Sequence, residues 1–167
     1  MLPQSAYAKE GSRREAAKEK VQDRMEERKE ERDNRREDSC ERLKERLASK
    51  ETNFDNSHKF HIRQYQRIKE KIAKVIRDAN SAGKNTTQLT ANLETLNEKI
   101  EKFDADRTAL INALKVVQMR ACAEDKEDFK EKLEEAQALH KTVLADVKDI
   151  KSYYQNTIRP SLKALKD

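Results

Sequence analysis

The sequence predicts an all-α protein: an elongated antiparallel three-helix bundle or coiled coil, with a very long first helix protruding beyond the bundle. Three observations lead to this fold class. Charged residues make up 41% of the 167 residues and apolar residues only 35%, a balance typical of long helices with narrow seams. Apolar residues recur at spacings of three and four through most of the chain. Finally, no glycine or proline lies between Gly11 and Gly83, so neither helix breaker interrupts that stretch.

The first helix is expected to begin at Ser12, because Ser12-Arg13-Arg14-Glu15 matches a capping box. Residues 1–11 are then a signal-peptide remnant or a disordered N-terminus. Residues 12–39 carry almost no apolar stripe, Val21 and Met25 being the exceptions. We therefore expect a solitary, solvated, charged helix over 12–39, supported by ion pairs within the helix.

From Cys40 onward a continuous apolar seam appears, and residues 40–160 are predicted to form the bundle. Gly83 marks a turn, and Pro160 is expected to kink or end the last helix. This gives helices at about 40–81, 86–122 and 125–159, with a C-terminal tail at 161–167. Residues 52–57 are poor helix formers, so a kink there was the alternative. The seam keeps its phase through them, and we favour one continuous helix. The seam positions are Cys40, Leu43, Leu47, Phe54, His58, His61, Tyr65, Ile68, Ile72; Leu89, Leu93, Leu96, Ile100, Phe103, Arg107, Leu110, Leu114, Val117; and Phe129, Leu133, Ala136, His140, Val143, Val147, Ile150, Tyr154.

A hairpin at Gly83 makes a register prediction, because facing residues of antiparallel helices have numbers with a constant sum. Aligning Ile72 with Leu89 also aligns Leu47 with Leu114. The same register places Cys40 almost level with Cys122, so we predict a disulfide between them and an oxidising compartment. The alternative is a pair of small buried thiols in a cytosolic bundle.

The N-terminal residues give a second indication of export. Ala6 and Ala8 fit the small residues that precede a signal-peptidase cleavage site, and Pro3 fits the helix break before it. A disordered tail that happens to contain this pattern is the alternative. No apolar run is long enough to span a membrane. We therefore expect an extracytoplasmic location: secreted, periplasmic or on the cell surface.

No catalytic or cofactor motif occurs, so we expect neither an enzyme nor a cofactor. Narrow helical seams are also expected to leave no ligand-sized cleft. The candidates for a metal site are His58 and His61, three residues apart on one helix, with His140 as a distant third. We expect no metal site, and interpret these histidines as seam residues or as a polar layer that fixes the register.

Two surfaces are candidates for binding. Arg24, Arg28, Arg32 and Arg36 form a row at a spacing of four on the first helix, and Tyr153 lies off the seam near the Gly83 end. The net charge of +5 is expected to be spread over a surface of mixed sign, without the one-sided basic face of a typical nucleic-acid binder. A merely solvated charged face is the simpler interpretation of the arginine row.

Several features together resemble a loose class of uncharacterised, exported, charge-rich helical proteins known from bacterial genomes, notably those of candidate-phylum bacteria. They are the Glu/Arg-rich first helix, Cys40 within Asp-Ser-Cys-Glu-Arg, Cys122, the turn around Gly83, and the ending Tyr153 to Pro160. The resemblance implies fold and export, and no functional residue. The function expected is that of a non-enzymatic structural or interaction protein, a rigid helical spacer or adaptor with a protein partner or self-association. The alternative is a module that binds an anionic polymer or surface, such as nucleic acid or the cell envelope, through the first helix.

Overall fold

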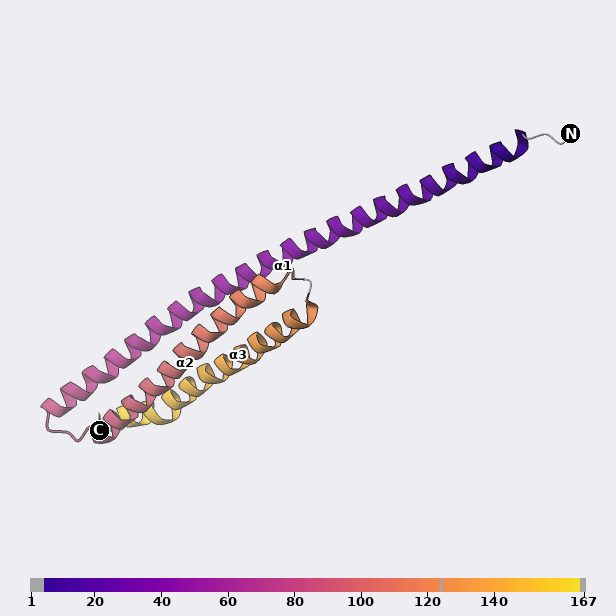
Figure 1. Cartoon of the computed structure of the whole chain (residues 1–167). Coiled ribbons are helices and arrows are strands. Elements are labelled where there is room, and N and C mark those ends of the chain that lie inside the picture. Colours follow the sequence, from indigo (N-terminus) through magenta and orange to yellow (C-terminus); the bar gives the residue numbers. More distant parts are fainter. Residues whose placement is uncertain (1–4, 124, 166–167) are drawn as a thin grey trace. The chain divides into compact units, whose positions relative to one another are not determined.

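A computed structural model describes residues 5–123 and 125–165, with side chains from Lys18 onward. Within these residues the chain is all-α, with no strand (Figure 1). The main helices are α1 (Ser5–Ser81), α2 (Thr87–Arg120) and α3 (Lys126–Tyr153). This confirms an all-α helical bundle with one very long helix. The chain divides into two compact units, residues 1–43 and 44–167, and α1 contributes residues to both.

The helix α1 begins at Ser5, and the predicted start at Ser12 is wrong. Ser12 lies inside the helix, so the capping-box pattern does not mark its N-terminus. The physical reason is that residues 5–11 include alanine, lysine and glutamate, which are good helix formers, while a single interior glycine costs only about 1 kcal/mol. The expected signal-peptide remnant falls partly on residues 1–4, which lie outside the described residues.

Across residues 52–57, α1 runs without interruption, which confirms the continuous helix. Local side chains support this weak stretch. Thr52 Oγ1 donates to the carbonyl of Ala48 at 3.0 Å, and Lys59 Nζ lies 2.6 Å from Asp55 Oδ2 one turn earlier. These contacts use polar groups that in other settings compete with the helix.

Gly83 ends α1 and reverses the chain. Its φ of 74° is in the left-handed region, which glycine adopts without strain. The Gly83 N–H donates to Asn80 O at 2.9 Å and the Lys84 N–H to Ala79 O at 3.0 Å. This pair of bonds is the Schellman motif, which satisfies the last carbonyl groups of a helix.

The two helices that follow begin at polar residues, as their sequences predicted. At the start of α2, Asn85 Oδ1 accepts from the Thr87 N–H at 3.0 Å. The side chain of Thr86 turns back and donates to Asn80 Oδ1 at 2.6 Å. At the start of α3, Asp125 accepts from the N–H groups of Glu127 and Asp128. These acceptors satisfy backbone donors that have no partner within the helix.

Beyond α3 the chain stays helical as far as Ala164, so the predicted helix end at 159 is wrong and the alternative, a distortion of the helix at Pro160, occurs. Of the expected tail at 161–167, residues 166–167 lie outside the described residues. A π-helical turn, η1 (Tyr154–Ile158), leads into a short helix, α4 (Arg159–Ala164). Pro160 is the physical cause, because it has no N–H to donate and its ring crowds the carbonyl one turn earlier. A wider turn relieves this crowding, and the Arg159 N–H bonds to Tyr154 O, five residues back.

The core of the second unit is the predicted seam. In Figure 1, α2 runs antiparallel to the C-terminal part of α1 and α3 antiparallel to α2. Phe103 and Val117 on α2 are among the most buried side chains, each 0% exposed. Buried apolar residues from α1, α2, α3 and η1 join them: Leu47, Tyr65, Ile72, Leu89, Leu96, Ile100, Leu110, Ile111, Leu114, Ala136, Val143, Ile150 and Ile158.

Contacts between helices follow the predicted register within a turn. The ring centroids of His58 and Phe103 are 6.0 Å apart, and Arg107 bonds to the backbone of Phe54. Between α2 and α3, Lys99 Nζ lies 2.7 Å from Asp149 Oδ2. The periodicity and the turn at Gly83 were thus sufficient to predict which residues face one another in the second unit.

Candidate binding sites

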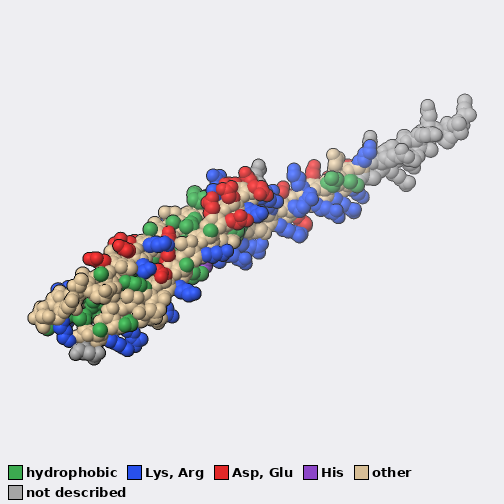
Figure 2. Space-filling view, turned by 90° about the horizontal axis from the view of Figure 1, so that it is seen from below, with side chains coloured by type: hydrophobic (Ala, Val, Ile, Leu, Met, Phe, Trp, Pro, Cys, Tyr) green, Lys and Arg blue, Asp and Glu red, His purple; other side chains and the backbone are tan. Residues whose placement is uncertain are grey.

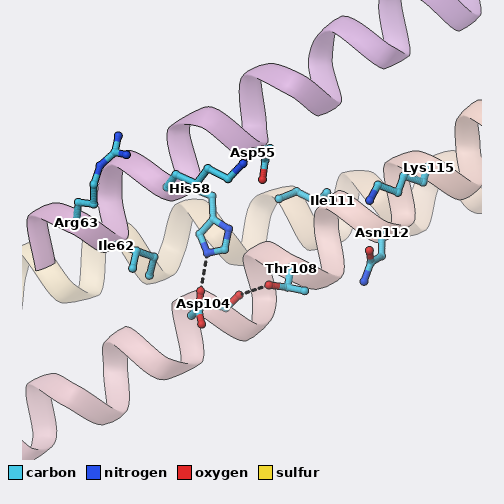
Figure 3. A pocket seen from close by; sticks show the side chains of 10 residues that line it. Asp55, His58, Ile62, Arg63, Asp104, Thr108, Ile111, Asn112 and Lys115 are labelled. Carbon is cyan, nitrogen blue, oxygen red and sulfur yellow. Dashed lines mark hydrogen bonds and ion pairs between the residues drawn. The ribbon is translucent and has the colours of Figure 1, made fainter. Parts of the chain in front are cut away.

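A groove of about 560 Å³ lies between α1 and α2 within the second unit (Figure 3). It contradicts the expectation that narrow seams leave no ligand-sized cleft. The seam itself is filled, and the groove lies beside it where long polar side chains flank the two helices. Its lining residues are Asp55, His58, Lys59, Ile62, Arg63, Asp104, Thr108, Ile111, Asn112 and Lys115.

Most of the chemistry-bearing groups in this groove already have partners. His58 Nε2 lies 2.6 Å from Asp104 Oδ1 across the two helices, as Figure 3 shows. Lys59 pairs with Asp55, and its hydrogen bond holds the pKa of that carboxyl below the usual value. The Thr108 hydroxyl donates to the Asp104 carbonyl at 2.9 Å, so it is not held by a base. The groove therefore contains no nucleophile and base arranged for catalysis among its lining residues.

His61 is enclosed by aromatic rings rather than by metal ligands. Its centroid lies 5.8 Å from those of Tyr65 and Phe103 and 5.9 Å from that of Phe60. Burial, followed by the charges of Arg107 and His58, lowers its pKa. Within the described residues, no group of three or more His, Cys, Asp or Glu side chains is placed to hold a metal ion. His140 lies elsewhere, its ring centroid 5.2 Å from that of Phe54.

Arg107, which seemed to violate the seam, is buried in it with 5% of its surface exposed. Its guanidinium carbon lies 4.5 Å from the Phe54 ring centroid, and Nη2 donates to Phe54 O at 3.0 Å. The buried Nε has no hydrogen-bond partner among the described residues. Burial lowers the pKa of the guanidinium, yet the cation–π contact and the carbonyl compensate part of the desolvation. The ring of His140 contacts the same Phe54 ring.

A second polar cluster joins α2 to α3. Lys102 Nζ lies 2.7 Å from Asp106 Oδ2 and 2.6 Å from Asp146 Oδ1. Hydrogen bonds to Asp106 and then Asp146 raise the Lys102 pKa to about 12. Burial raises the pKa of Asp146, whose Oδ2 is buried without a partner. A lysine already occupies the position between the two carboxylates, so this cluster is a structural link rather than a cation site.

Tyr153, the candidate contact residue near the Gly83 end, is less exposed than a free surface residue. Its side chain is half-buried, with Lys99 Nζ 5.3 Å from the ring centroid and its hydroxyl 3.5 Å from Asn92 Oδ1. Asn92 is itself buried and donates to Ser161 Oγ at 2.9 Å. Residues close to a seam therefore become part of the packing even when their spacing is off by one position.

The described side chains of residues 18–39 are exposed, with Cys40 the first that is half-buried. Within residues 18–43, one ion pair forms between described side chains, Arg35 Nη2 to Glu31 Oε2 at 3.2 Å. This pair is one of the ion pairs expected to support the helix, and the other described side chains of this segment form no ion pair with one another. The reason is the sign pattern: residues four positions apart mostly carry the same charge, as in the row Arg24, Arg28 and Arg32.

Within residues 23–37 the charges of opposite sign lie on two different sides of the helix. At about 100° per residue, the cations of residues 23–37 fall within a sector of about 140°, and six of the seven anions fall opposite within about 120°. In Figure 2, Lys and Arg side chains predominate on the visible side of α1 beside the grey residues. We call these sets the basic face (Arg24, Arg28, Lys29, Arg32, Arg35 and Arg36) and the acidic face (Asp23, Glu26, Glu27, Glu30, Asp33 and Glu37).

The two cysteines are both disulfide-bonded, and no described cysteine is free. Cys40 is half-buried and Cys122 is exposed.

No helix of the described residues has the length and hydropathy needed to cross a membrane. No protein-family model, curated protein or solved structure matches the chain. Its function must therefore be inferred from its own residues.

Some residues that organise these sites were not singled out from the sequence. Asn92 and Asp146 are buried, and Asp104 is the partner of His58. Asn92 lies three residues after Leu89 and Asp146 three after Val143, so helical spacing alone placed both beside the seam. Asp104 directly follows Phe103, which the register had already placed opposite His58.

Proposed function

We propose that the protein is a non-enzymatic rigid helical spacer or adaptor. The observation that carries this proposal is α1, a helix of 77 residues without interruption. The charged part of this helix, residues 18–39, is exposed and contributes no core, so the length of this part needs an explanation other than packing.

The bundle supports a structural role rather than catalysis. Its polar side chains make contacts between helices, as in Arg107 with the Phe54 carbonyl and Lys102 with Asp146. The groove beside it holds His58 and Asp104 in contact with each other. Side chains arranged in this way fix the alignment of helices, which is what an adaptor requires of its folded end.

The stiffness of α1 can be tested by electron–electron distance measurement. Spin labels carried by noncanonical residues at Lys20 and Lys50 leave both cysteines untouched. A continuous helix predicts a narrow distribution centred at about 45 Å. Glu31→Pro is the matched control, which should shorten and broaden the distribution. A wild-type distribution as broad as that of Glu31→Pro would refute the spacer.

We also propose that Cys40 and Cys122 are bonded to each other and that the protein works outside the cytoplasm. The support is that both cysteines are in the disulfide form. Such bonds persist in oxidising compartments, and one closing so long a loop stabilises by about 2–4 kcal/mol. Intact mass with and without reductant tests the pairing: a monomer gaining about 2 Da on reduction supports it. A dimer that reduction separates, or no mass change, contradicts it.

The second candidate is a module for an anionic polymer, such as nucleic acid or a cell-envelope polyanion. The basic face favours it, because guanidinium groups bind phosphate and carboxylate in a bidentate manner. Such binding should weaken by orders of magnitude between about 50 and 200 mM salt, and Arg28→Gln with Arg32→Gln should reduce the slope. Titration of a 30-base-pair duplex, followed by fluorescence anisotropy, measures this. Absence of binding at 50 mM salt contradicts the second candidate.

A further inference from the structure

The charged segment of α1 has an unusual combination of properties. Its two faces contain six cations and six anions over the same fifteen residues, 23–37. These side chains are exposed, and Arg35 is the one that forms an ion pair with another described side chain. That ion pair uses Glu31, the remaining anion, which lies at the border between the faces. Twelve charges are thus sorted by sign, and nearly all remain available to a partner.

The sorting is costly for an isolated helix. Opposite charges at a spacing of four stabilise a helix by about 0.2–0.5 kcal/mol per pair, and like charges destabilise it by similar amounts. Two rows of like charge at this spacing destabilise the helix in this way: Arg24, Arg28 and Arg32, and Asp23 and Glu27. A helix that was only a solvated rod would be more stable if the same residues were placed with opposite charges four positions apart. The arrangement therefore indicates a contact outside the helix.

We infer that the partner of this segment is a second copy of the chain, with the basic face of one copy against the acidic face of the other. Charge complementarity carries the choice. The segment has six basic and seven acidic residues, a net charge of −1, so at long range it does not attract a polyanion. A second copy supplies an acidic face of matching length, about 21 Å at 1.5 Å per residue.

Parallel pairing suits this arrangement. In a parallel pair of helices related by a two-fold axis, one flank of each helix meets the opposite flank of its partner. A basic flank then meets an acidic one along the whole segment, whereas an antiparallel pair would bring flanks of the same sign together. Val21 and Met25, which are 56% and 65% exposed, lie on the side of the basic face and add apolar area. The inference rests on the proposed spacer, because the faces exist only where the helix is continuous.

The test is sedimentation velocity of the full chain across a concentration series. Because exposed ion pairs are weak and screened by salt, we expect self-association at 50 mM NaCl that weakens by at least about tenfold at 500 mM. Charge reversal of the basic face (Arg24, Arg28 and Arg32→Glu) and of the acidic face (Asp23, Glu27 and Glu30→Lys) should each make the chain monomeric. An equimolar mixture of the two variants should associate again.

Two controls keep the test decisive. Arg67, Lys71 and Lys74→Glu changes three exposed cations of α1 in the second unit and should leave association unchanged. Replacement of Arg24, Arg28 and Arg32 by Gln removes association without creating an all-acidic helix, and circular dichroism checks that helix content is kept. A wild-type chain that is monomeric at 50 mM NaCl overturns the inference, as does a mixture that stays monomeric. Neither result affects the distance distribution that tests the spacer.

Discussion

The two units of this chain use the same helix for opposite purposes. In residues 18–39, α1 exposes its side chains, and its charges are sorted onto two faces. In the second unit, α1 buries Leu47, Tyr65 and Ile72 against α2 and ties its polar residues to specific partners. The second unit forms a core, whereas the described side chains of residues 18–39 stay at the surface. The difference shows that helix formation and tertiary packing are separable requirements, which substitutions can test individually.

The largest effect is expected at Phe103, which is fully buried and contacts His58, His61 and Tyr65. Phe103→Ala should lower the free energy of unfolding by about 3–5 kcal/mol, because it loses apolar burial and leaves a cavity. Urea denaturation followed by circular dichroism measures this. A loss below about 1 kcal/mol would mean that the aromatic cluster does not form the centre of the bundle.

Arg107 separates the contribution of volume from that of charge. Arg107→Ala should cost about 2–4 kcal/mol, since it removes the contact with Phe54 and leaves space in the core. Arg107→Met keeps most of the volume and removes a buried cation, so its cost should be within about 1 kcal/mol or negative. Urea midpoints of both variants give the comparison. Equal losses would show that the cation itself stabilises the bundle.

Gly83 tests the turn alone. A Cβ at this position would meet no atom within 4 Å, so the cost of Gly83→Ala comes from the positive φ and not from a clash. We expect a loss of about 1–2 kcal/mol in the free energy of unfolding. Ser81→Ala, an exposed change at the end of the same helix, is the control and should cost less than 0.5 kcal/mol. An unchanged stability in Gly83→Ala would mean that the turn adopts a different conformation.

His61 should make the second unit sensitive to acid. Its folded-state pKa lies below its ordinary value of about 6.5, so the unfolded chain binds the proton more readily. The stability due to neutral His61 is therefore present above pH 6.5 and is lost as the pH falls below it. His61→Phe should flatten the pH profile of the urea midpoint between pH 7.5 and 5, and Lys71→Gln should keep the wild-type profile. An identical slope in His61→Phe and the wild type contradicts this assignment.

The smallest effect is expected in the first unit. Met25 is 65% exposed, so Met25→Ala should change the free energy of unfolding by less than about 0.5 kcal/mol. The measurement is the same urea titration used for Phe103→Ala, which makes the two regions directly comparable. A loss above 1 kcal/mol would show that the charged segment contributes to a core after all.

Helical periodicity and the position of Gly83 predicted the helices of the second unit, their seam, and the residues that face one another, such as His58 and Phe103. These features depend on spacing along one chain, which a sequence displays directly. Element ends were less predictable. Ser12 looked like a cap because its pattern is local, yet preceding residues propagate the helix to Ser5. Pro160 looked like an end, yet a π-helical turn accommodates it.

The sequence by itself determined that this protein is helical, where it turns, and which stripe is buried, because each follows from backbone preferences and the period of apolar residues. Tertiary structure determined which partners the polar residues have. Arg107 donates a hydrogen bond to the Phe54 carbonyl, His58 contacts Asp104 through its side chain, and the Lys99 ammonium lies over the Tyr153 ring. Such pairings depend on side-chain reach across helices, a distance that spacing along one chain does not encode.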